Sequence, residues 1–300
     1  MAGQLRARGR ERVERAARIL AAAGYDVSLN PTPGPGAAGD IARRAIAAGI
    51  DLILVAGGDG TLNEAMEGVV NTPVPLGLLP AGTANVLANE LGLVTDLEGA
   101  AKVLPQCVAR RLAVGRLDSG SQARHFVAMA GVGFDAHIVY NLNASLKGRF
   151  GKGAYWICGF AHAVRRYPEF EIEVDGSLCG PCSFALVTRV RNYGGDFEIA
   201  REIKLIEDRF EVVLFRGRHA LPYLKYLGGL VTNTLPRMSG VSFMTARSVR
   251  VFDPADRRVY IQVDGEYAAR LPASITVVPD ALTLMVPPEY CASTPGPGMR

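Results

Sequence analysis

The stretch IDLILVAGGDGTLNE, residues 50–64, constrains the fold more than any other part of this 300-residue chain. Six of its first seven residues are apolar, which predicts a strand buried on both faces, as a central strand of a parallel sheet is. Two glycines end the strand, and a segment with helical spacing of apolar residues follows. This arrangement predicts an anion site, because backbone N–H groups at a helix N-terminus point outward and glycine has no Cβ to keep a phosphate away. The candidate phosphate-binding residues are Gly57, Gly58, Asp59, Gly60, Thr61, Leu62 and Asn63.

Asp59 is the unusual member of this turn, because a carboxylate beside a phosphate repels it unless a cation lies between them. The pattern therefore favours Mg²⁺ together with a nucleotide polyphosphate. The alternative is a tight strand-to-helix turn that merely requires glycine, and a short motif on its own leaves both open.

A second glycine turn, PAGTAN at residues 80–85, follows another short apolar strand at 76–79 and leads into a helical segment. Strands alternating with helices predict a parallel α/β sheet with its ligands at the carboxyl ends of the strands. Thr83 would then lie beside the first turn and help to enclose one polyphosphate. Its alternative role is an ordinary helix N-cap.

From about residue 113 the pattern changes to short alternating segments separated by Asp-Gly and Gly-rich turns. Such segments predict an antiparallel sandwich or barrel, interrupted by helices at 153–166 and 219–234. We therefore expect an α/β domain at 1–112, an all-β sandwich-like domain at 113–287, and a disordered Pro/Gly-rich tail at 288–300.

Composition narrows the function classes only a little. Hydrophobic residues make up 49% and charged residues 21%, as in ordinary globular proteins, and the net charge of +4 is mild. Five scattered cysteines give no disulfide framework, which favours a reducing cytoplasm. No signal-peptide core is present, and the most apolar stretch, 154–164, is too short to cross a bilayer.

The turn VDGE at 263–266 places two carboxylates around a glycine. Asp-Gly is a preferred hairpin turn, so the plain interpretation is structural. The chain contains a comparison, VDGS at 174–177, which has the same turn without the second acid and is interpreted as purely structural. The extra Glu266 is not needed for turning, and Asp264 and Glu266 could supply a base for a substrate hydroxyl and an acceptor for metal-bound water or ribose.

Three of these motifs, GGDGTLNE, GLLPAGTANVLANELGL and the DGE triplet, occur in the order found in the diacylglycerol kinase catalytic-domain family, which the chain resembles over roughly residues 10–287. The resemblance implies an ATP- and Mg²⁺-dependent kinase that phosphorylates a lipid hydroxyl, most simply that of diacylglycerol. NAD kinases share the GGDG core but lack a PAGTAN-like helix start, and NAD kinase is the first alternative. A non-catalytic nucleotide- or lipid-binding module is the second.

The resemblance also implies roles for individual residues. It places the catalytic base in the DGE triplet, with Glu266 favoured as proton acceptor and Asp264 close by. It maps a structural magnesium site onto the segment 204–212, with ligands Leu205 O, Asp208 and Phe210 O, although Asp208-Arg209 replaces the family's usual Asp-Gly; the alternative is a plain turn. Arg149, in the basic loop 146–153, is a candidate for the triphosphate or an anionic headgroup, or is simply solvated. Thr32 corresponds to a threonine loop on the adenosine side.

One departure concerns the N-terminus. In the family a strand and an NPxSG-like loop precede the first helix, whereas this sequence begins almost at that helix. Either the start codon is assigned too late or the protein lacks an edge strand and part of its nucleotide clamp. The resemblance further implies peripheral contact with the inner face of the membrane and no nucleic-acid partner. It leaves the lipid and the oligomeric state open, a homodimer being one option.

Overall fold

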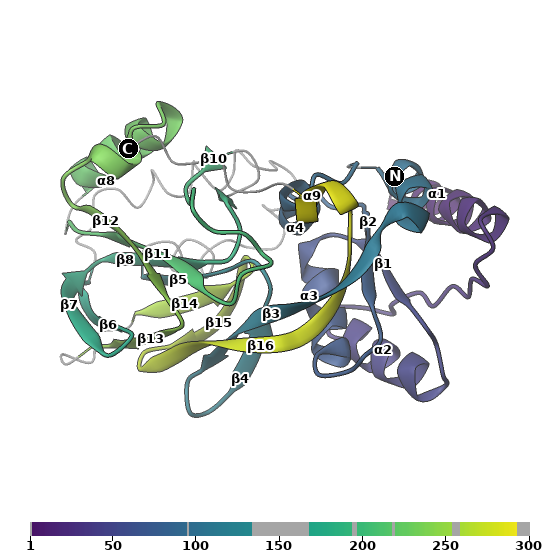
Figure 1. Ribbon diagram of the computed structural model, residues 1–300, viewed down its shortest axis with the longest axis horizontal. Helices are drawn as coiled ribbons and strands as arrows, with labels where there is room; N and C mark the ends of the chain where they lie inside the picture. Colours follow the sequence, from purple (N-terminus) through teal and green to yellow (C-terminus); the bar gives the residue numbers. More distant parts are fainter. Residues whose placement is uncertain are drawn as a thin grey trace. The chain divides into compact units, whose positions relative to one another are not determined.

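The computed structural model describes residues 2–94, 96–133, 168–193, 197–217, 220–253 and 259–292, and the chain divides into two compact units (Figure 1). The first unit comprises Met1–Leu112 and Asp280–Arg300, and the second comprises Ala113–Pro279. The chain passes between them inside β3 (Val108–Asp118) and β16 (Ala273–Val286). Residues 280–292, which the sequence places in the second domain and the tail, thus join the first unit.

The first unit is built on parallel strands. Its elements are α1 (Ala2–Ala22), α2 (Ala38–Ala47), β1 (Ile53–Gly57), α3 (Asp59–Val69), β2 (Leu76–Pro80), α4 (Val86–Glu90), α5 (Leu97–Val103), a short 3-10 helix (Leu104–Gln106), the end of β16 and α9 (Pro288–Ala292). β1 pairs with β2 in parallel from Ile53↔Leu76 to Gly57↔Pro80, and Leu284 of β16 continues the parallel pairing at Leu76. The predicted α/β class is confirmed.

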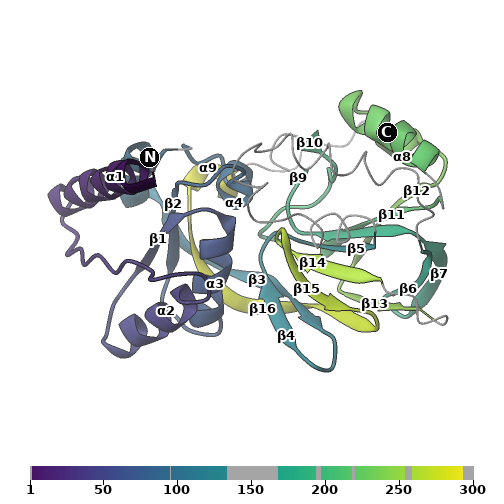
Figure 2. The same cartoon turned by 180° about the vertical axis from the view of Figure 1, so that it is seen from behind.

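Helices cover the strand pair on two sides (Figures 1 and 2). On one side α1 and α5 share a core with β2 through Ala16, Leu20, Leu79, Leu97, Ala100, Ala101 and Leu104. On the other side α2 approaches α3 closely, because both helices carry glycine at the contact. A Cβ on Gly68 would lie 2.4 Å from Gly39 O, so only glycine permits this separation.

Three local expectations differ from the structure. β1 lies at the end of the strand order among the described residues, and Ala56 is exposed, so β1 is an edge strand rather than a central one. Residues 25–29, whose sequence YDVSL predicts a short strand, form none, because their backbone has no ladder partner in the described chain. The predicted tail begins with α9, whose Tyr290 hydroxyl donates a buried hydrogen bond of 2.7 Å to Glu90 on α4.

The second unit is antiparallel. One sheet has the order β12-β11-β8-β5-β14-β15, and the strands β13, β6 and β7 pair alongside the first half of β16. Their bounds are β5 (Met129–Gly133), β6 (Phe170–Val174), β7 (Ser177–Cys182), β8 (Phe184–Thr188), β11 (Phe210–Phe215), β12 (Val241–Ala246), β13 (Ser248–Phe252), β14 (Tyr260–Val263) and β15 (Glu266–Arg270). Inward residues of both sheets form one apolar core that includes Phe126, Phe170, Ile172, Phe210 and Ile275. The expected sandwich-like second domain is confirmed.

The remaining elements of this unit are short. They are β4 (Ala123–Phe126), β9 (Asn192–Tyr193), β10 (Phe197–Glu198), α8 (Ala220–Val231) and a 3-10 turn (Leu235–Arg237). α8 falls within the helix expected at 219–234, while the helix expected at 153–166 lies outside the described residues. Within the described residues, each helix is too short or too polar to span a bilayer.

Candidate active site

The two glycine turns of the first unit meet backbone to backbone. The parallel register sets Gly57 opposite Pro80, and Ala81 N donates 2.9 Å to Gly57 O just beyond the last pair. A Cβ built on Gly82 would lie 2.6 Å from the Cα of Gly58. The chain therefore requires glycine at this crossing, and the predicted proximity of the two turns is confirmed.

The first turn opens directly into α3. Gly58 is the N-cap in extended conformation, and no side chain caps the helix, so the N–H groups of its first turn remain available to an anion. Gly57 ends β1, and the expected turn at Asp59 and Gly60 is already the start of the helix. Thr61, Leu62 and Asn63 follow within the first two turns of α3.

Asn63 is an unusual member of α3. It is 2% exposed, and its Nδ2 has no hydrogen-bond partner among the residues that the structure describes. A buried amide without a partner costs free energy, so its retention at this turn calls for an explanation. The sequence predicts that Asn63 binds phosphate; in the structure it lies in the second turn of α3 and does not line the pocket described below.

The carboxylate of Asp59 reaches across to the second turn. Its Oδ1 accepts a 2.8 Å hydrogen bond from Val86 N, the first residue of α4. Burial raises the pKa of this carboxyl, and the backbone N–H groups of Val86 and Asn85 partly oppose that effect. Asp59 therefore joins the two turns mechanically, which the sequence does not indicate.

Asn85 completes the second turn and is a residue that sequence reasoning misses. It adopts the left-handed region at φ +46°, accepts 2.9 Å from Gly82 N through Oδ1, and donates 3.0 Å to Gly82 O through Nδ2. This ring of hydrogen bonds fixes the backbone around Thr83, whose side chain is exposed. An asparagine directly before the helix of a Gly-Thr turn is the signal that could have identified it.

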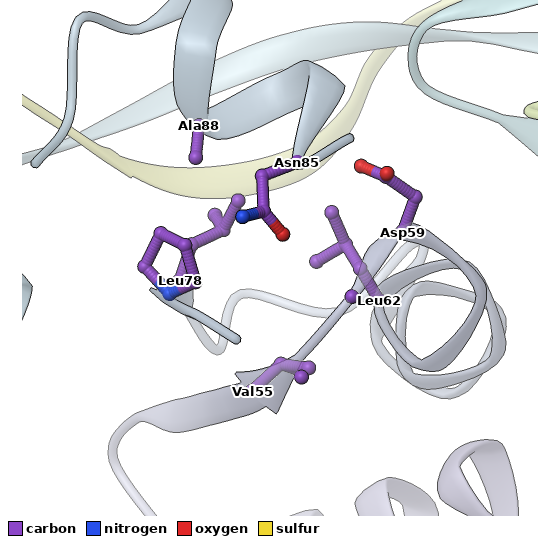
Figure 3. A pocket seen from close by; sticks show the side chains of 9 residues that line it. Val55, Asp59, Leu62, Leu78, Asn85 and Ala88 are labelled. Carbon is purple, nitrogen blue, oxygen red and sulfur yellow. The ribbon is translucent and has the colours of Figure 1, made fainter. Parts of the chain in front are cut away.

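A small pocket lies where these turns meet (Figure 3). Asp59 and Asn85 stand on the side where α3 and α4 begin, and apolar side chains of β1, β2 and the helices close the rest. Its lining residues are Val55, Gly57, Gly58, Asp59, Leu62, Leu78, Pro80, Asn85 and Ala88.

The loop that contains Thr32 is tied to α3 by Glu64. One carboxylate oxygen of Glu64 accepts 2.7 Å from Gly36 N, and the other accepts 3.2 Å from Ala38 N at the start of α2. Thr32 itself is exposed in this loop. Glu64 is a second residue that the sequence does not assign a role, because its partners lie 26 and 28 positions away.

In the second unit the two acids of the DGE triplet have different surroundings. Asp264, at φ +47° in the β14–β15 turn, accepts backbone hydrogen bonds through both carboxylate oxygens, from Val127 N at 3.0 Å, Ala128 N at 3.1 Å and Met129 N at 2.7 Å. Glu266 instead opens β15 and forms an ion pair with the guanidinium of Arg124 on β4. Asp264 is thus an anchor for residues 127–129, whereas Glu266 pairs with a side chain.

The segment proposed for structural magnesium has its own partners. Leu205 O accepts a 2.6 Å hydrogen bond from the guanidinium of Arg189, while the Asp208 side chain is exposed and Phe210 begins β11. Within the described residues, no group of three or more His, Cys, Asp or Glu side chains is arranged to hold a metal. Arg149 lies outside the described residues.

Comparisons with known proteins agree on one family. The profile of the diacylglycerol kinase catalytic domain matches residues 2–117, and that of the YegS C-terminal NAD kinase beta sandwich-like domain matches 128–286. Two curated diacylglycerol kinases are similar in sequence. The one from Bacillus subtilis is 29% identical over 89% of this chain and 88% of its own length. The one from Mycobacterium tuberculosis is 28% identical over 81% of this chain and 79% of its own length.

A solved structure shows the same fold. The crystal structure of a diacylglycerol kinase from Bacillus anthracis superposes with a TM-score of 0.75 at 21% identity, covering 93% of this chain and 92% of that one. The two profiles, which match residues 2–117 and 128–286, and the curated relatives show that the chain belongs to the diacylglycerol kinase catalytic-domain family of lipid kinases.

Proposed function

We propose that this protein transfers the γ-phosphoryl group of ATP to the hydroxyl of a lipid, most simply diacylglycerol, with Mg²⁺ bound beside the phosphates. The observation that carries the proposal is the crossing of Gly58 and Gly82, which brings an uncapped helix N-terminus and a Gly-Thr turn to one pocket. Backbone N–H groups concentrated in this way favour a polyphosphate.

The residues at the pocket fit a nucleotide with its metal. Asp59 supplies a carboxylate at the pocket, and the uncapped N-terminus of α3 supplies backbone N–H groups for phosphate oxygens. When bound, Mg²⁺ would neutralise charge that builds up on the phosphates. The backbone of residues 57–61 and Thr83 would hold the phosphates, and Asp59 would orient the water around the ion.

We propose that Glu266 takes the proton from the lipid hydroxyl while the oxygen of that hydroxyl attacks the γ-phosphorus in line. Asp264 is engaged by three backbone N–H groups, which leaves Glu266 as the acid free to exchange its partner. The mechanism requires Glu266 and the glycine turns to approach the same substrate. Positioning of this kind accounts for most of the catalysis in phosphoryl transfer.

The experiment is a transfer assay with purified protein, labelled ATP and Mg²⁺. Acceptors are diacylglycerol, a sphingoid base and another long-chain alcohol in mixed micelles, with NAD as a separate acceptor. Labelled phosphate in a lipid product that requires Glu266 supports the proposal. Transfer to NAD alone would identify a different acceptor, and ATP binding without transfer to any acceptor would indicate a non-catalytic module.

A further inference from the structure

The segment 201–210, which leads into β11, is held by a buried cation that belongs to the chain. Arg189 follows β8 and is fully buried. Its Nη2 donates to Leu205 O at 2.6 Å, and its Nη1 donates to Glu207 O at 3.0 Å and to Arg209 O at 3.3 Å. Three alternate carbonyl groups of one turn therefore converge on a single guanidinium.

A buried anion holds the other end of the same segment. Glu211 is 4% exposed, and its carboxylate accepts from Glu202 N at 3.0 Å and from Arg201 N at 3.5 Å. In the β8–β11 register Glu211 lies opposite Thr188, the residue before Arg189. The chain thus presents carbonyl oxygens to its cation and N–H groups to its anion, which satisfies the backbone of this turn from within.

A metal ion does not fit beside this guanidinium. Mg²⁺ binds oxygen at about 2.0–2.1 Å, so an ion on Leu205 O would lie within about 5 Å of the Nη2 that already donates to that oxygen. At an effective dielectric constant of about 20, repulsion at this separation weakens cation binding by on the order of a hundredfold for each unit of its charge. The Asp208 carboxylate, which would have to compensate, is exposed.

We propose that Arg189 is the structural cation of the 201–210 segment and that Leu205, Asp208 and Phe210 do not bind Mg²⁺ in this protein. The planar guanidinium suits the role, because its N–H groups diverge in a fixed fork and can reach several carbonyls at once. The stability of the segment is then independent of divalent cations. Magnesium remains necessary for phosphoryl transfer, where the nucleotide carries it.

The test is thermal unfolding of the full chain without nucleotide, in excess EDTA and in excess MgCl₂. The wild-type protein is expected to unfold at the same temperature in both, and Asp208→Asn is expected to match it. Arg189→Met, which keeps the apolar stem, removes a charge whose partners stay buried. It should lower the unfolding temperature by on the order of 10 °C, with no recovery in MgCl₂. The unfolding temperature of Arg189→Lys should lie between those of the wild type and Arg189→Met, since one ammonium group cannot reach three carbonyl groups.

The chelation arm uses the wild-type protein, Asp208→Asn and Asp59→Asn, so it decides the matter even if Arg189→Met does not fold. An unfolding temperature that falls in EDTA, with the fall absent in Asp208→Asn, would overturn the proposal. A magnesium effect that disappears in Asp59→Asn but persists in Asp208→Asn supports it, because the ion is then at the glycine turns. No substrate is present, so the result is independent of whether the protein phosphorylates a lipid.

Discussion

Asp264 and Asp175 occupy equivalent positions in two Asp-Gly hairpin turns. Both adopt the left-handed region, at φ +47° and +44°, and each directs its carboxylate to the backbone N–H groups of a neighbouring segment. Asp175 accepts from Arg247 N at 3.0 Å and Ser248 N at 2.8 Å, as Asp264 does from residues 127–129. The turn at 174–177 has no second acid, so Asp175 shows the structural role that an aspartate has at this position. That role is to accept hydrogen bonds from the backbone of a neighbouring segment.

The first prediction separates the two acids of the triplet. Asp264→Asn and Asp175→Asn should each lower the free energy of unfolding by about 1–3 kcal/mol, because asparagine keeps the left-handed backbone but loses acceptor capacity. Glu266→Gln should leave stability within about 1 kcal/mol, since its ion pair with Arg124 is partly exposed. It should nevertheless reduce kcat by about 10²–10⁴-fold. Urea titration and the lipid assay give both quantities.

The reverse pattern would refute this division of roles. If Glu266→Gln retained turnover within tenfold of wild type while folded Asp264→Asn lost it, the anchoring aspartate would be the proton acceptor. Asp175→Asn controls for the effect of a weakened hairpin on activity.

The second prediction concerns the crossing of the glycine turns. Alanine at Gly82 would place its Cβ 2.6 Å from Gly58 Cα and 2.7 Å from Asn85 Oδ1, so backbone must move. A displacement that costs about 1–3 kcal/mol raises the Kd for ATP by about 5–150-fold. Gly228→Ala is the matched control, because a Cβ there has nothing within 4 Å. Unchanged ATP affinity in Gly82→Ala, measured by calorimetry, would contradict the proposed phosphate site.

Sequence predicts the glycine crossing because the information is local. Two consecutive parallel strands end at one edge of a sheet, so the turns after Gly57 and Pro80 must be neighbours once the strands are recognised. The sandwich class follows in the same way from alternating segments and Asp-Gly turns. Local patterns of this kind are sufficient to predict the fold class and the pair of glycine turns in the candidate site.

Long-range polar contacts are not predictable in this way. Arg124 and Glu266 lie 142 positions apart, and neither stands in a pattern that points to the other. Arg189 lies beyond the end of a buried strand in the sequence LVTRVR, where an arginine gives no sign that it is buried and binds three carbonyls. The edge position of β1 is hidden too, because an apolar run does not report which neighbours it has.

The third prediction separates two roles of Asp59, which accepts a hydrogen bond from Val86 N and is proposed to act beside the metal ion. Asparagine keeps an oxygen for Val86 N, whereas alanine removes it, so Asp59→Ala should lose about 0.5–2 kcal/mol of stability and Asp59→Asn little. Both variants should lose phosphoryl transfer, since neither carries the charge that balances a metal ion. An Asn variant with wild-type turnover would rule out the proposed metal role.

The same residue gives a pH dependence. Burial raises the pKa of Asp59 in the folded protein above its value of about 3.9 in the unfolded chain. The stability that the protonated acid contributes is therefore complete below the unfolded pKa and is lost as the pH rises through the folded pKa. The free energy of unfolding of the wild type minus that of Asp59→Asn should fall as the pH rises from about 4 through the folded pKa. A difference that rises over this range would show that Asp59 is held as a favourable carboxylate instead.

The last prediction concerns Glu64 as a positioning residue for the loop that contains Thr32. Its two carboxylate oxygens take the N–H groups of Gly36 and Ala38, and α2 has no side-chain cap of its own. Glu64→Ala removes both acceptors, so the amides of Gly36 and Ala38 should exchange hydrogen faster, by about 5–30-fold for a loss of 1–2 kcal/mol.

The kinetic consequence of that change is specific. If residues 30–38 contact the adenosine side of the nucleotide, Glu64→Ala should raise KM for ATP while leaving kcat at saturating ATP near the wild-type value. Glu14→Ala is the control, because its exposed pair with Arg10 on α1 contributes little. Faster hydrogen exchange with an unchanged KM for ATP would show that the loop does not take part in nucleotide binding. Unchanged exchange would show that Glu64 does not hold the loop.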